Sequence, residues 1–171
     1  MRVLKLLFYP ASGSGPDPFG PPESWKPNFF VFQVRTIQSF HIEGRKWSDI
    51  AYNYLVGGEG AVYEGRGWDK EGAHTLGWNN KSIGICLIGT FTTIEPTQRQ
   101  LTATQRLIAR GVKLGKIDQN YRLLAHKQVQ STESPGRLMF AIMKTWPHWY
   151  NTSVSEDWLY AQQRNPAGVY I

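Results

Sequence analysis

The chain has 171 residues, a length that suits one folded domain with a single sizeable core. Hydrophobic residues make up 41% of it and charged residues 19%, which excludes a disordered or fibrous protein. The formal net charge of +6 favours an anionic partner, such as nucleic acid, a membrane surface or an acidic polymer. Nucleic-acid-binding elements concentrate their basic residues, whereas here no basic run is longer than two, so we expect no nucleic-acid partner.

The sequence contains no recognisable targeting signal. The start, Met1 to Tyr9, is interrupted by Lys5 and too short for the apolar region of a signal peptide. No segment reaches the roughly 20 apolar residues that a membrane helix needs. The single cysteine, Cys86, lies in an apolar run and cannot form an internal disulfide, so we interpret it as a small buried hydrophobe.

The first half of the chain predicts a loop, a helix and a hairpin. Residues 10–27 hold six of the ten prolines, a composition that predicts a loop or flexible arm. Apolar and aromatic positions then recur at helical spacing and predict a helix over 31–43 that ends at Gly44. The runs 52–56 and 61–64 flank a glycine-rich connection and predict a hairpin. The inward positions of the helix are predicted to be Val31, Val34, Ile37, Phe40 and His41.

The second half alternates strands with helices. The continuous apolar run 83–88 predicts a strand covered on both faces, central to the sheet. Thr97 and Gln100 fit a capping box, which predicts a second helix that reaches about residue 114. A short strand over 122–125 and a third helix opened by Pro135 and ended by Pro147 follow. The inward positions of this helix are predicted to be Leu138, Met139, Ile142, Met143 and Trp146.

Several short motifs occur in a specific order and spacing, namely Val34-Arg-Thr-Ile-Gln38, Asp49-Ile-Ala-Tyr-Asn53, Tyr63-Glu-Gly-Arg-Gly-Trp68, Gly72-Ala-His-Thr75, Ile83 to Gly89, Ser134-Pro-Gly136 and Thr145-Trp-Pro-His-Trp149. Together they resemble the peptidoglycan recognition protein family over residues 31–150. The resemblance implies an α/β fold of the type 2 amidase kind, with a central mixed β-sheet, about three flanking helices and a ligand groove on one face. It divides the chain into an atypical Pro/Gly-rich segment 1–30, an N-terminally incomplete recognition domain 31–150 and a loosely attached tail 151–171.

The resemblance also implies a test for catalysis. Enzymatic relatives are zinc amidases that cut between N-acetylmuramic acid and L-alanine, with the zinc held by an early His, a second His and a Cys eight residues later. Here His126 matches the second His, but Ser134 stands at the Cys position and residues 1–40 contain no His. A serine hydroxyl cannot replace a thiolate, so we expect no metal, no cofactor and no catalytic residue. His126 becomes a hydrogen-bonding residue on the groove floor, and Tyr52, which matches a catalytic tyrosine, becomes a contact or packing residue.

The ligand-binding positions are better preserved. In the family the dipeptide Gly-Trp accompanies meso-diaminopimelate in the stem peptide, and this chain has Lys46 followed by Trp47, which keeps only the aromatic half. Arg66 matches the arginine that diaminopimelate-type members aim at the extra carboxylate, which a guanidinium can bind bidentately. A surface salt bridge is the alternative for Arg66. The further positions that match sugar or peptide contacts are His41, His74 and Asn79.

We therefore expect an innate-immune pattern-recognition module that binds bacterial peptidoglycan or muropeptides, of diaminopimelate type, without hydrolysing them. The resemblance implies association with another copy or another recognition protein, and a secreted chain or the extracellular part of a receptor. One alternative is a regulatory or decoy isoform that binds a sister receptor. The other is a zinc-dependent N-acetylmuramoyl-L-alanine amidase.

Loss of the early family strand would leave an unpaired sheet edge, which invites aggregation. Residues 2–9 are rich in Leu, Val and aromatic residues, as strands are. We predict that this segment occupies the vacated strand position. A disordered leader is the alternative.

Overall fold

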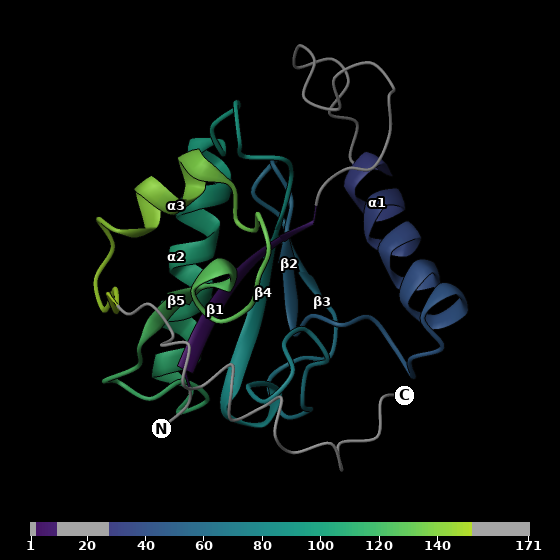
Figure 1. The fold of residues 1–171 in the computed structure, drawn as a ribbon, viewed down its shortest axis with the longest axis horizontal. Coiled ribbons are helices and arrows are strands. Elements are labelled where there is room, and N and C mark those ends of the chain that lie inside the picture. Colours follow the sequence, from purple (N-terminus) through teal and green to yellow (C-terminus); the bar gives the residue numbers. More distant parts are fainter. Residues whose placement is uncertain (1–2, 10–27, 152–171) are drawn as a thin grey trace.

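The computed structural model describes residues 3–9 and 28–151, which form one five-stranded sheet in the order β3-β2-β4-β1-β5. Strand β3 is antiparallel to β2, and every other pair in the sheet is parallel. Helix α1 lies on one side of the sheet, and α2 and α3 lie on the other (Figure 1). The predicted α/β class with a mixed sheet and three helices is confirmed. The bounds are β1 Val3–Tyr9, α1 Asn28–Ser39, β2 Tyr54–Val56, β3 Val62–Glu64, β4 Ser82–Ile88, α2 Gln98–Lys113, β5 Leu123–Ala125 and α3 Arg137–Met143.

Strand β4 is the centre of the molecule, and all seven of its residues are buried. Successive side chains of a strand point to opposite faces. Ile83, Ile85 and Leu87 therefore join the core beneath α2 and α3, whereas Cys86 and Ile88 join the core beneath α1. The prediction of a central strand covered on both faces is confirmed, as is the burial of Cys86.

Helix α1 differs from its prediction in phase and in both ends. It begins at Asn28, and after Ser39 it continues as a π-helical turn, Phe40–Gly44. The predicted inward positions Val31 and Phe40 are 46% and 43% exposed, so that assignment is wrong. The aromatic-rich start of the helix offers apolar residues on several sides, so the sequence does not fix which side faces the sheet. The buried side follows Phe30, Ile37 and His41, with Val34 half-buried beside them.

The predicted hairpin is confirmed, and its strands β2 and β3 are shorter than predicted. Helix α2 has the predicted N-cap but only half of the predicted capping box. The Thr97 side chain accepts a hydrogen bond from the Gln100 amide at 3.1 Å. The Gln100 side chain does not reach back to Thr97. Its Nε2 donates instead to the carbonyls of Val56 at 2.8 Å and Ile88 at 3.1 Å. A buried amide thus ties the start of α2 to the ends of β2 and β4.

Helix α3 begins at Arg137, two residues after the predicted start. Met139, Met143 and Trp146 are buried against the sheet as predicted. Leu138 and Ile142 are only half-buried, and Ile142 packs against the same core.

Strand β1 occupies the position predicted for the N-terminal segment, but that position is not a sheet edge. Val3–Tyr9 lies between β4 and β5 and is parallel to both. The expectation of an edge was wrong because β5 provides a neighbour on the far side. The predicted arm 10–27 and all but the first residue of the predicted tail lie outside the described residues. None of the helices in the described ranges has the length and apolarity that crossing a membrane requires.

Deletion of residues 1–9 should lower the melting temperature sharply and reduce the yield of soluble monomer. The deletion removes the hydrogen-bond partners of β4 and β5, whose residues are buried, and each buried group left unpaired costs about 1–3 kcal/mol. Leu6→Pro tests the same point at constant length, because residue 6 pairs with both neighbouring strands and proline removes a donor. Melting curves and size-exclusion profiles like those of the unmodified chain, for both variants, would contradict the placement of β1.

Candidate ligand-binding groove

A groove of about 660 Å³ opens where the parallel strands β4 and β5 end. Thr90 and Thr92 follow β4, and His126 follows β5, so loops from both strands supply its walls. Ligand sites of open α/β sheets commonly lie at the carboxyl ends of the strands. The structure brings four of the predicted binding residues together here, namely His41, Trp47, Tyr52 and His126.

His41 is the centre of an aromatic wall. Its ring stacks on Trp47, with centroids 5.1 Å apart and planes 21° apart, and meets the edge of Tyr52 at 5.6 Å. Its Nδ1 accepts a hydrogen bond from the Ala51 amide at 3.2 Å, which places the ring proton of the neutral form on Nε2. Burial and then the charges of Arg45 and Arg66 lower its pKa to about 4. His41 is therefore a neutral hydrogen-bond donor at physiological pH.

The position of the family's zinc site does not fit a catalytic zinc ion. His126 Nε2 lies 3.0 Å from Gln130 Oε1, and Ser134 is buried at the second matching position. Catalytic zinc requires about three protein ligands. The ranges 3–9 and 28–151 contain no group of three His, Cys, Asp or Glu side chains that could hold a metal.

Arg66 does not line the groove but is held close to its aromatic wall by backbone carbonyls. Its Nε donates to Ile50 O at 2.7 Å, Nη1 to Glu71 O at 3.0 Å and Nη2 to Asp49 O at 3.4 Å. A guanidinium has five N–H donors, so these contacts leave one N–H on each terminal nitrogen. Carbonyls orient the group without neutralising its charge, and the ion pairs within the described residues include none to Arg66.

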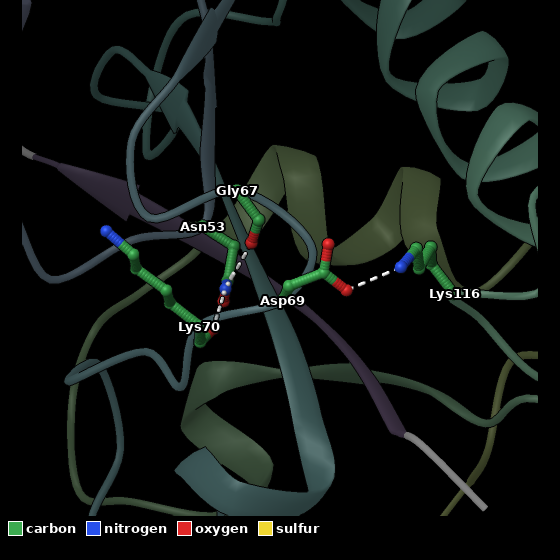
Figure 2. A network of polar contacts seen from close by, with 5 residues as sticks. All are labelled: Asn53, Gly67, Asp69, Lys70 and Lys116. Atoms are coloured by element: carbon green, nitrogen blue, oxygen red, sulfur yellow. Dashed lines mark hydrogen bonds and ion pairs between the residues drawn. The ribbon is translucent and has the colours of Figure 1, made fainter.

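Asn53 fixes the loop that carries Arg66, and the sequence analysis missed this role. The side chain is fully buried, and its Nδ2 donates to Gly67 O at 2.8 Å and to Lys70 O at 2.9 Å (Figure 2). Its Oδ1 accepts from the Gly84 amide of β4 at 2.9 Å. The signal was available, because Asn53 is a lone amide at the start of an apolar run. The partners of Asn53 could not be predicted from the sequence, because they lie up to 31 residues away.

The same loop is closed at a second point by an ion pair between Asp69 and Lys116, a residue just beyond α2 (Figure 2). Both side chains are substantially exposed, so we assign this pair a minor contribution to stability.

His74 and Asn79 do not line the groove. Asn79 Oδ1 accepts hydrogen bonds from the amides of His74 at 3.0 Å and Thr75 at 2.7 Å. The His74 ring lies directly against Gly84, where an added Cβ would meet it at 2.3 Å. This geometry gives both residues a role in shaping the loop, and their contact with ligand stays a prediction.

Lys46, the residue that replaces the family's glycine, has a left-handed backbone with φ 59°. Glycine adopts this conformation without steric cost, whereas another residue there costs about 1–3 kcal/mol. This strained position carries an exposed lysine side chain.

Further groove residues were not predicted. Phe40 begins the π-helical turn and Arg45 follows its last residue, and the Arg45 guanidinium lies 5.4 Å from the centroid of the Phe40 ring. Gln130 and Glu133 come from the loop that follows β5. A helix that continues for one π-helical turn cannot be recognised from apolar spacing alone, so the sequence did not predict that Phe40 lines the groove.

Comparison with known proteins identifies the family. Residues 28–137 match the family model described as N-acetylmuramoyl-L-alanine amidase. The crystal structure of peptidoglycan recognition protein-LE in complex with tracheal cytotoxin, a monomeric diaminopimelic acid-type peptidoglycan, is 44% identical. Its TM-score is 0.79, and the match covers 91% of this chain and 84% of that one. The chain belongs to the peptidoglycan recognition protein family.

Two curated members of the family illustrate the extent of the match. Peptidoglycan-recognition protein LE of Drosophila melanogaster is 53% identical over 124 residues, which are 72% of this chain and 36% of that protein. Peptidoglycan-recognition protein LB of the same species is 45% identical over 123 residues, 72% of this chain and 53% of that protein. The chain thus spans only part of the length of these peptidoglycan recognition proteins.

The neutral state of His41 predicts a pH dependence of stability. The ordinary pKa of histidine, 6.5, applies to the unfolded chain, and it falls to about 4 in the folded protein. The unfolded chain therefore binds more protons than the folded protein between pH 4 and pH 6.5. The free energy of unfolding should therefore fall as the pH is lowered from 6.5 towards 4. His41→Asn keeps an acceptor for the Ala51 amide but cannot titrate, so it should reduce this slope. Urea unfolding at a series of pH values measures the slope for the unmodified chain and for the variant. Equal slopes would refute the assignment of this pH dependence to His41.

Proposed function

We propose that this chain binds fragments of bacterial peptidoglycan in the groove and does not hydrolyse them. The observation that carries the proposal is the composition of the groove. It combines an aromatic wall, formed by His41, Trp47 and Tyr52, with hydroxyl, amide and charged groups among its other lining residues, and the described residues hold no group of three His, Cys, Asp or Glu side chains that could bind a metal. Such surfaces suit sugar rings and peptide amides. The related structure of a human recognition protein in complex with glycosamyl muramyl pentapeptide supports the ligand class.

The preferred ligand in this proposal is peptidoglycan of diaminopimelate type. Diaminopimelate differs from lysine by one carboxylate, which needs a fixed cation. The carbonyls of Asp49, Ile50 and Glu71 hold the Arg66 guanidinium in one orientation, and its charge is not neutralised by them. The relative LE was crystallised with a diaminopimelic acid-type ligand, which supports the same preference.

The signalling role proposed here is innate-immune recognition through association with a second recognition protein. The solved complex of the ectodomains LCa and LCx with tracheal cytotoxin, 46% identical to this chain with a TM-score of 0.75, supports that mode of action. We assign the recognition domain to residues 31–150 together with strand β1.

Arg66→Ala should weaken binding of a diaminopimelate muropeptide by about tenfold or more, because it removes a charge-assisted contact of about 1.5–3 kcal/mol. Binding of the matching lysine muropeptide should change far less. Isothermal titration calorimetry measures both affinities. Arg35→Ala is a suitable control, because Arg35 is an exposed arginine of α1 outside the groove. Equal losses for the two ligands would make Arg66 a structural or general charge contact.

The purified chain should contain no stoichiometric zinc and should release no stem peptide from muropeptides. Ser134→Cys alone should restore neither property, because the cysteine and His126 together still supply fewer than the about three ligands that zinc requires. Elemental analysis and chromatography of the muropeptide products measure these outcomes. Stoichiometric zinc, or cleavage by the single variant, would show that a ligand has been misplaced.

A further inference from the structure

A second concave surface lies between α2 and the edge strand β3, and it shares no lining residue with the ligand groove. Its volume is about 530 Å³. Helix α2 contributes Arg99, Arg106 and Arg110, and β3 contributes Val62, which is 41% exposed. We call this surface the basic cavity.

The lining of the basic cavity carries three arginines and one acidic residue, Glu59. Within the ranges that the structure describes, the ion pairs include none to Arg99, Arg106 or Arg110. The acid in the lining, Glu59, accepts a hydrogen bond from the Tyr63 hydroxyl, and burial raises its pKa. The cavity therefore presents three guanidinium groups to an anionic partner.

The walls of the basic cavity are preformed. The Thr97 hydroxyl donates to Gly58 O, and the Gln100 amide donates to Val56 O, so the hairpin is hydrogen-bonded to the start of α2. Gly60 has φ 91°, and a Cβ built on it would lie 3.1 Å from the Arg99 Cβ. This close approach holds the hairpin turn against the helix.

Strand β3 is the first strand of the sheet, and its outer edge pairs with no other described strand. A smaller cavity of about 280 Å³ lies on its other side, lined by Val31 and Val34 of α1 together with Tyr63. Arg35 and Glu64 also line this second cavity, so its charges are balanced. Because successive residues of a strand face opposite sides, an additional strand beside β3 would direct alternate side chains into the two cavities.

We propose that the β3 edge docks an extended peptide in which acidic and apolar residues alternate. The peptide adds a strand to the sheet, with its acidic side chains at the arginines of α2 and its apolar side chains at Val31 and Val34. Along a helix, Arg99 and Arg110 are about 16 Å apart. An extended strand covers the same length with about five residues. Acids at alternate positions of such a peptide are about 6.6 Å apart, close to the rise of about 6 Å between Arg106 and Arg110, and three of them extend along most of the row that Arg99 begins.

The test is a fluorescence anisotropy titration of the intact chain with two fluorescein-labelled hexapeptides of equal composition. The alternating peptide is Glu-Val-Glu-Val-Glu-Val, and the block peptide is Glu-Glu-Glu-Val-Val-Val. The alternating peptide should bind about tenfold more tightly than the block peptide, since only it can satisfy both cavities and the strand edge. Arg106→Glu should weaken it by about tenfold or more through charge reversal. Arg122→Glu is the matched control, because Arg122 precedes β5 at the opposite edge of the sheet, and it should leave the affinity unchanged.

Three results would overturn the proposal. They are equal affinity for the two peptides, equal loss in the two variants, and equal binding of an alternating peptide whose amides are N-methylated along one edge. A surface that binds all of these peptides equally and releases them fully to poly(glycerol phosphate) would instead be a general anion-binding surface. Muropeptide binding, measured in parallel on the same variants, should be unaffected, which separates failure of this proposal from failure of the proposed ligand groove.

Discussion

The burial of strand β4 on both faces is the constraint on which the rest of the structure depends. A strand without an exposed residue needs a cover on each face and a neighbour on each edge. Helix α1 covers one face, α2 and α3 cover the other, and β1 and β2 flank it in parallel. Because β1, β4 and β5 are parallel, the loops that follow β4 and β5 emerge at the same end of the sheet, and this end is where the groove opens.

The same strand also positions the residue proposed to select the ligand. Gly84 of β4 exchanges hydrogen bonds with Asn53, whose backbone amide donates to the Gly84 carbonyl and whose side chain accepts from the Gly84 amide. The Asn53 amide group then holds the loop from Gly67 to Lys70, next to Arg66. Each backbone carbonyl around Arg66 restricts its orientation and leaves its positive charge in place. The core and the residue proposed to select the ligand are thus connected through one buried side chain.

The sequence predicted what depends on local pattern. The apolar run of β4, the N-cap at Thr97 and the glycine-rich hairpin were readable because each is encoded by neighbouring residues. The convergence of His41, Trp47, Tyr52 and His126 followed from the family resemblance. Long-range contacts were not readable: the apolar positions of α1 did not reveal its phase, and Gln100 bonds to strand ends rather than to its own cap. His74 and Asn79 matched binding positions, yet the structure places them in a supporting loop because their partners are backbone amides and Gly84.

In the proposed function, the groove binds its ligand against the aromatic wall and returns it intact. The most direct measurement is calorimetric titration of the unmodified chain with a diaminopimelate muropeptide, followed by mass spectrometry of the recovered ligand. The account predicts saturable binding, weaker binding of the lysine form, and a recovered ligand of unchanged mass. Absence of binding would identify a decoy that recognises another receptor, and a ligand shortened by loss of its stem peptide would identify an amidase. Either result would contradict the central claim.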